Sequence, residues 1–195
     1  MKLKTAAGEP VEETTNVSEK ERSKCTLSQD MINLLIRQLW HELYNHNLYR
    51  SFANFFGVRG LVVLEQYYME RAKEEKHHHD WISNYLADCD AEFIYPEVPA
   101  VKEKWENNIE PFKLTVKAEI ETTTLIHEMV SKAMEECDWA TFAWLNGNDD
   151  EKGRLVIEQI EEESISRTVL DIASEDAPWL IKEKAIMAAY TGDLD

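Results

Sequence analysis

An acidic residue interrupts the apolar stripe of a long predicted helix, and a histidine follows it one turn later. Residues 61–87 contain no proline and place apolar residues at steps of three, four and seven, which predicts an amphipathic helix. Glu75 and His78 occupy two positions of that stripe, where core residues would be expected. Because burial of an unpaired carboxylate is costly, Glu75 needs a compensating side chain, a water network or a metal ion.

Three further predicted helices carry acids in the middle of their apolar stripes. They cover residues 28–56, 109–136 and 149–173, and their inward acids are Glu42, Glu119, Glu158 and Glu162. The glycine-rich turn at 57–60 predicts that the first two long helices lie antiparallel. A connection of about twenty residues follows the second, and it is long enough to cross the length of a bundle. The expected fold is therefore all-α: an antiparallel four-helix bundle with a long crossover and a short fifth helix.

The chain divides into three parts. Residues 1–25 are polar and charged and predict a disordered tail, whereas residues 26–174 contain the bundle. Residues 175–195 contribute a short helix, expected at 179–190, and a tail. This last helix is fairly apolar, so we expect it to pack on the bundle.

Short polar residues mark the expected helix starts. Thr26 or Ser28 is expected to cap the first helix, and Ser174 the last. Asp138 precedes a short helical piece at 139–145, which ends where Asn146, Gly147, Asn148 and Asp149 predict a break.

Composition excludes several classes of partner. The chain has 38 acidic and 21 basic residues and a formal charge of −17, which disfavours nucleic acid and anionic lipid and attracts cations. No apolar run is long enough to cross a membrane, and the first residues do not resemble an export or transit signal. Cys25, Cys89 and Cys137 are odd in number and widely spaced, which fits a reducing compartment better than a disulfide framework. We therefore expect a cytoplasmic protein.

Each acidic feature also has a simpler explanation. Glu75 and the other inward acids can pair with a basic side chain, for which Arg71 and Lys76 are candidates. The run at 161–163 is typical of a solvated face, and the histidines at 77–79 of a surface patch. Acids inside all four helices favour a shared metal centre over these separate explanations. Many carboxylates with few imidazoles suit iron better than copper or zinc.

The chain resembles the non-haem ferritins, most closely the bacterial type, from about residue 26 to 173. Four segments carry the resemblance: HELYNHNLY, AKEEKHHHDWISNYL, TVKAEIETT and EQIEEES. It implies that Glu42, Glu75 and His78 hold one iron ion. It also implies that Glu75, Glu119 and Glu162 hold a second, with Glu75 bridging the two. The implied activity is oxidation of Fe(II) by dioxygen or peroxide, with storage of the mineral in a cage of twenty-four subunits.

The resemblance also implies roles for residues near this pair. Tyr49 would supply an electron during oxygen chemistry, and Gln159 would support the ligands as the family's glutamine does. The implied third iron site would be formed by Glu74, Glu158, Glu161 and Glu162.

Some positions depart from the family pattern. Glu161 stands where a bacterioferritin has the histidine of a second Glu-x-x-His, and Met69 is the only methionine in 61–87, so no haem is expected. Residues 146–157 are about seven longer than the bacterial pattern, which amounts to roughly two helical turns. Arg154 stands where that pattern usually has tryptophan.

Three alternatives remain. One is a rubrerythrin-like or other di-iron oxidoreductase, although the chain lacks a rubredoxin-like cysteine quartet. A mini-ferritin that coats DNA is disfavoured by the charge of −17. The third is a non-storing helical protein of ferritin-like fold, which would leave the inward acids unexplained.

Overall fold

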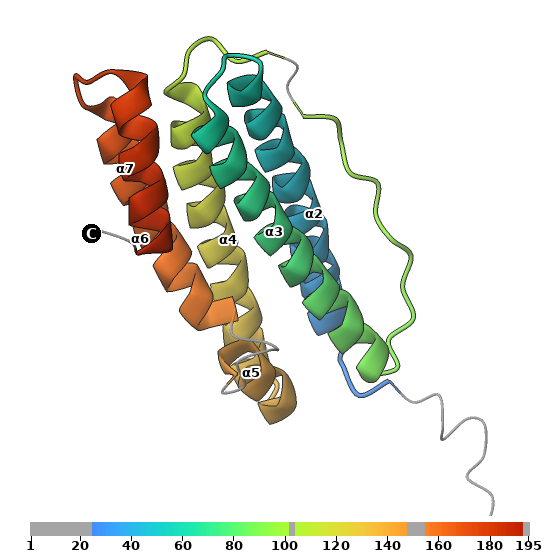
Figure 1. Cartoon of the computed structure of the whole chain (residues 1–195). Helices are drawn as coiled ribbons and strands as arrows, with labels where there is room; N and C mark the ends of the chain where they lie inside the picture. The colour runs from blue at the N-terminus through green and yellow to red at the C-terminus, as the bar shows by residue number, and fades with distance from the viewer. Residues whose placement is uncertain (1–24, 102–103, 148–154, 193–195) are drawn as a thin grey trace, which may run out of the picture.

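The computed structural model describes residues 25–101, 104–147 and 155–192, and every regular element within these ranges is a helix. The helices are α2 (Gln29–Gly57), α3 (Val62–Asp88), α4 (Glu110–Glu135), α5 (Trp139–Asn146), α6 (Leu155–Ser174) and α7 (Trp179–Thr191). The four long helices lie side by side, with α5 at one end and α7 folded back along the bundle (Figure 1). The predicted all-α bundle is confirmed. Among the described residues, no helix is long and apolar enough to span a bilayer.

Several predicted features fall wholly or largely outside the described residues. These are the N-terminal tail, most of the break and insertion between 146 and 157, Arg154, and the last residues of the C-terminal tail.

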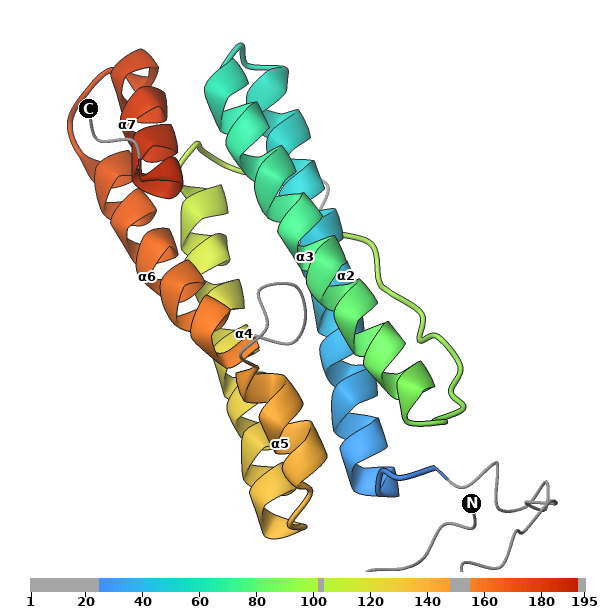
Figure 2. The same ribbon diagram turned by 60° about the horizontal axis from the view of Figure 1, so that its bottom comes forward.

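The long connection between α3 and α4 sets the direction of the bundle. It begins after Asp88 and leads to Glu110, and its described parts run along the outer side of α2 (Figure 1, Figure 2). The indole nitrogen of Trp40 donates to the carbonyl oxygen of Glu97 at 2.9 Å, which fastens the connection to α2. Consequently α3 and α4 run in the same direction, and both run antiparallel to α2 and α6 (Figure 1, Figure 2).

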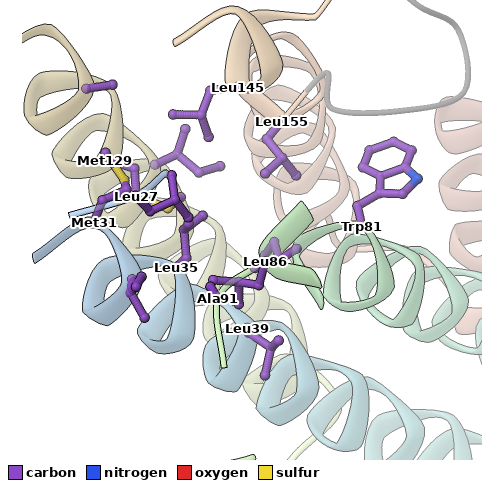
Figure 3. Close-up of a cluster of buried hydrophobic side chains, with 14 residues drawn as sticks. Leu27, Met31, Leu35, Leu39, Trp81, Leu86, Ala91, Met129, Leu145 and Leu155 are labelled. Carbon is purple, nitrogen blue, oxygen red and sulfur yellow. The ribbon is translucent and has the colours of Figure 1, made fainter. Parts of the chain in front are cut away.

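Two apolar clusters fill the bundle, one toward each end. The first is mainly aliphatic and gathers side chains from α2 to α6, including Leu35, Leu39, Met129 and Leu155 (Figure 3). The second is rich in aromatic rings and includes Tyr49, Phe56, Tyr68, Phe112 and Val169.

The inward acids lie between these clusters. On α4, Phe112 belongs to the aromatic cluster and Ile126 to the aliphatic cluster, and Glu119 is seven residues from each. On α6, Glu162 stands midway between Leu155 and Val169 in the same way. Because seven residues span about two helical turns, the spacing places these acids at one level of the bundle.

Side-chain caps are found at two of the predicted helix starts. The Ser28 hydroxyl accepts from the backbone nitrogen of Met31 at 3.0 Å, and Asp138 accepts from that of Thr141 at 3.0 Å. The prediction for Ser174 is wrong. It is the last residue of α6, and its hydroxyl donates to the carbonyl oxygen of Leu170, so α7 starts after Pro178 without a side-chain cap.

Helix α7 packs on α3 and α6, as its apolar character predicted. Its Ile186 is fully buried, and the amine of Lys182 donates to the carbonyl oxygen of Ala173 at 2.8 Å. The Glu183 carboxylate accepts from the backbone nitrogen of Val63 at 3.3 Å. These contacts hold α7 against the face of the bundle that carries Glu74 and Glu162.

The Ser28 cap gives a first stability prediction. We expect Ser28→Ala to lower the free energy of unfolding by about 1 kcal/mol, because it leaves the Met31 nitrogen without its partner and removes the bond to Glu136. Ser51→Ala is the matched control. The Ser51 hydroxyl bonds only a carbonyl of its own helix, so we expect a change below about 0.5 kcal/mol. Urea unfolding at one protein concentration measures both variants, and equal losses would contradict the capping role.

Candidate metal centre

Four carboxylates and one imidazole meet in the layer between the two clusters. Glu42, Glu75 and His78 each offer one ligand atom, and these atoms lie within 4.8 Å of one another. Glu75, Glu119 and Glu162 form a second group within the same limit. Both groups contain Glu75, so the structure brings together all five side chains that the sequence suggested as ligands of an iron pair. Glu42 and Glu119 are fully buried, and Glu75 is 1% exposed.

Two carboxylate oxygens of this layer have no hydrogen-bond partner among the residues that the structure describes. They are Oε2 of Glu42 and Oε1 of Glu75, and both are buried. The other oxygen of Glu42 accepts from the side-chain amide of Gln38 at 2.6 Å, which fixes the orientation of that carboxylate. Buried carboxylate oxygens without donors are costly unless a cation binds them. The donor set therefore fits hard, oxygen-preferring metal ions such as iron.

Arg71 is the basic side chain of this layer. It is 2% exposed, and its guanidinium donates to Glu119 at 2.5 Å, to Glu162 at 3.1 Å and to Glu74 at 3.0 Å. The nearest guanidinium nitrogen is 3.9 Å from Glu75. Pairing with Arg71 is thus confirmed for Glu119 and Glu162. The other candidate, Lys76, instead pairs with a surface aspartate.

The charges of the layer do not balance. Its four carboxylates face one guanidinium and one imidazole. Even with His78 protonated, two negative charges remain when all four carboxylates are ionised. Protons or cations must supply the difference, because isolated buried charges are unstable.

Bound protons supply part of the missing positive charge, because the pKa values of three groups in the layer are raised. Burial raises the pKa of Glu75 well above its ordinary value, and the charge of Glu42 adds to the effect. Burial raises the pKa of Glu162 to about 7, although the charges of Arg71 and His78 oppose it. For His78, burial lowers the pKa, but the charge of Glu162 and the hydrogen bond to Glu158 outweigh it, and the pKa rises to about 9.

These shifts predict how stability depends on pH when a chelator keeps metal away. The folded chain holds protons on Glu162 and His78 more tightly than the unfolded chain, so each group stabilises the fold at low pH and loses that effect as pH rises. The contribution of Glu162 disappears between pH 4.5 and about 7, and that of His78 between 6.5 and about 9. We therefore expect the melting temperature to fall steadily from about pH 5.5 to 9.

Thermal unfolding across this range measures the effect. Glu162→Gln should flatten the decline, because it removes one titrating group and the main charge that raises the pKa of His78. Glu161→Gln changes the exposed neighbour and should leave the decline intact. A melting temperature that rises through this window would contradict the assignment.

Tyr49 and Gln159 both orient Glu119. The Tyr49 hydroxyl donates to Oε1 of Glu119 at 2.5 Å, and the Gln159 amide donates to Oε2 at 3.0 Å. Burial raises the pKa of Tyr49 well above its ordinary value, so this phenol keeps its proton at neutral pH. Both residues that the resemblance implies beside the acids thus contact Glu119, and their roles stay predictions.

The acids suggested for a third site line a cavity beside the layer. The cavity measures about 810 Å³, and its walls include Glu74, Glu158 and Glu161. Glu158 is 3.1 Å from Nε2 of His78, and Glu74 accepts from the Tyr190 hydroxyl of α7 at 2.6 Å. The cavity joins the exterior to the buried layer, and its use as a third iron site stays a prediction.

Sequence reasoning missed Gln38 and Tyr190 as members of this region and did not foresee how fully Arg71 enters it. Gln38 and Arg71 each precede an inward glutamate, Glu42 or Glu75, by four residues, which puts them on the same helix face. That spacing was the available signal. No local signal connects Tyr190 with Glu74, because the contact depends on how α7 folds back.

Comparison with known proteins agrees with this geometry. The model of the ferritin-like domain family matches residues 32–170. A bacterial non-heme ferritin of Staphylococcus saprophyticus is 27% identical over 145 residues, which cover 74% of this chain and 83% of that protein. One from Staphylococcus aureus is 29% identical over 142 residues, covering 73% and 81%.

Solved structures give the same result. A humanized archaeal ferritin has a TM-score of 0.74 and 26% identity, covering 83% of this chain and 96% of that one. An open-pore ferritin from Archaeoglobus fulgidus has a TM-score of 0.74 and 25% identity, covering 84% and 98%. With a matched fold and a family match that spans most of the bundle, the chain belongs to the ferritin-like domain family.

Proposed function

We propose that this protein is an iron-storage ferritin that oxidises Fe(II) at a dinuclear site within its own bundle. One observation carries the proposal: two groups of three ligands share Glu75, and the layer holds two buried carboxylate oxygens without partners. A purely structural role explains Glu119 and Glu162 through Arg71. Among the described residues, it leaves one oxygen of Glu42 and one of Glu75 without a partner, whereas a pair of metal ions would bind all four acids.

Two sets of residues bind the two iron ions. Glu42, Glu75 and His78 bind one Fe(II), and Glu75, Glu119 and Glu162 bind the other. The shared carboxylate keeps the two ions close, so the pair supplies two electrons, the number that converts dioxygen to peroxide or peroxide to water. Negatively charged oxygen ligands stabilise the higher charge of Fe(III) over Fe(II), which favours oxidation.

Tyr49 would provide a further electron. Its phenol oxygen touches Glu119, so a proton leaving the phenol has an acceptor at 2.5 Å. Loss of this proton together with an electron avoids forming a buried phenolate, which the raised pKa of Tyr49 disfavours. The acid-lined cavity would lead Fe(II) toward the site, and Glu74, Glu158 and Glu161 would hold a third ion there.

Storage requires assembly, and we include a cage of identical subunits in the proposal. Large apolar side chains are exposed on the single chain, among them Ile94 (90%), Ile160 (67%), Leu180 (67%) and Ile181 (61%). Contacts between subunits would cover such side chains. The similarity to ferritins over most of the chain supports the same conclusion.

Aerobic addition of Fe(II) to the purified protein tests the proposal, with oxidation followed by absorbance and the particle sized afterwards. We expect rapid oxidation and iron retained in a particle of about half a megadalton. Oxidation by a small oligomer would keep the dinuclear site and remove the storage function. Glu42→Ala combined with Glu75→Ala should lose the activity, and oxidation at the unmodified rate by this double variant would refute the ferroxidase site.

A further inference from the structure

Arg71 contacts the same carboxylates that form the second ligand group. Its guanidinium donates to Glu119 at 2.5 Å and to Glu162 at 3.1 Å, and it lies 3.9 Å from Glu75. These three acids are the complete second group. In the first group, Arg71 makes no hydrogen bond or ion pair with Glu42 or His78 among the described residues.

A metal ion and this guanidinium cannot occupy the second group together. A small divalent ion binds carboxylate oxygens at about 2.0–2.2 Å, closer than any contact that Arg71 makes. It would sit among the three oxygens that the guanidinium faces, and two like charges a few ångströms apart inside a protein repel strongly. Occupation of the second group by metal therefore requires Arg71 to withdraw.

The structure provides a position for the withdrawn side chain. Glu74 already accepts a hydrogen bond from Arg71, and its side chain is 38% exposed at the acid-lined cavity. The cavity of about 810 Å³ is large enough for a guanidinium. Arg71 can thus leave Glu119 and Glu162 while keeping its bond to Glu74.

We propose that Arg71 is the internal counter-cation of the second ligand group and that it makes the two metal positions unequal. The group of Glu42, Glu75 and His78 fills first, because the Arg71 guanidinium does not have to leave Glu42 or His78. The group of Glu75, Glu119 and Glu162 fills second and more weakly, because metal must displace Arg71. Arg71 is thus a residue that controls the order and affinity of loading, and the inference rests on the proposed iron site.

Anaerobic calorimetric titration with Fe(II) measures the two affinities without oxidation. The unmodified protein should show a tighter and a weaker event at the layer, removed by Glu42→Gln and Glu162→Gln respectively. Arg71→Gln keeps a hydrogen-bonding side chain but removes the charge, and it should tighten the weaker event by about tenfold or more. Arg71→Lys keeps the charge and should leave the two events unequal.

Lys73→Gln is the matched control. Lys73 lines the same cavity on the same helix, but it pairs with Glu70 and is 65% exposed, so its loss should not change either affinity. Two events of equal affinity in the unmodified protein, with no change in Arg71→Gln, would overturn the role of Arg71 and leave the iron site standing. Absence of any binding that depends on Glu42 or Glu162 would instead refute the proposed function itself.

A crystal structure of the metal-loaded unmodified protein gives a test that does not depend on whether Arg71→Gln folds. With metal in both groups, the Arg71 guanidinium should have left Glu119 and Glu162 and should contact Glu74. A second metal ion bound while Arg71 still donates to Glu119 would overturn the inference.

Discussion

Glu75→Gln is expected to slow Fe(II) oxidation by about a hundredfold or more while making the metal-free protein more stable. Loss of a side chain that merely supports a metal ligand costs up to about a hundredfold, and Glu75 is itself the proposed ligand shared by both groups. Without metal, the fold keeps this buried carboxyl, whose Oε1 has no donor among the described residues, only at the cost of binding a proton, and a neutral amide removes that cost. We expect the free energy of unfolding to rise by about 1–2 kcal/mol.

The opposite signs of the two effects make this experiment informative. Fe(II) oxidation and urea unfolding in the presence of a chelator are measured on the same preparation. Glu121→Gln is the control, because Glu121 is exposed and lies two residues from Glu119 on α4, and neither quantity should change. If Glu75→Gln lost stability as well as activity, the carboxylate would be a structural element of the metal-free fold rather than a cost accepted for metal binding.

Phe112→Ala is expected to lower the free energy of unfolding by about 3–5 kcal/mol. Phe112 is 1% exposed, and its ring lies against those of Phe56, Tyr68 and Trp179, with centroids 5.5, 5.7 and 6.2 Å away. The substitution leaves a cavity where α2, α3, α4 and α7 meet, and packed aromatic rings cannot collapse into it without losing their own contacts.

Urea unfolding measures this loss against Val58→Ala, which shortens a side chain that is 74% exposed and should change stability by less than about 0.5 kcal/mol. A cost for Phe112→Ala no larger than for Val58→Ala would show that the aromatic cluster does not hold the α7 end of the bundle together. Retained iron oxidation in a folded Phe112→Ala protein would further separate this cluster from the metal centre.

Helix order and the layer of inward acids could be predicted because both follow from local spacing. Apolar residues at helical intervals define the stripes, and a carboxylate such as Glu119 midway between Phe112 and Ile126 stands out against them. The turn at 57–60 and the long crossover then bring four stripes to one core. The five ligand candidates therefore meet in space as the sequence indicated.

Contacts that depend on the direction of one long side chain or on the angle between helices could not be predicted in this way. Residue spacing puts Arg71, but not Lys76, on the helix face of Glu75. It does not show that the guanidinium reaches Glu119 and Glu162 on two other helices. Ser174 had the right chemistry for a cap, but α6 continues through it. The bond between Tyr190 and Glu74 depends on the angle at which α7 returns to the bundle, and no local pattern encodes that angle.

The most direct test of the central claim is an anomalous-scattering map, recorded at the iron absorption edge, of crystals soaked anaerobically in Fe(II). The account predicts two peaks inside each bundle, one among Glu42, Glu75 and His78 and one among Glu75, Glu119 and Glu162. Peaks confined to surface residues such as His77, with none inside the layer, would show that the buried acids are held by protons and Arg71 alone, and the dinuclear site would be refuted.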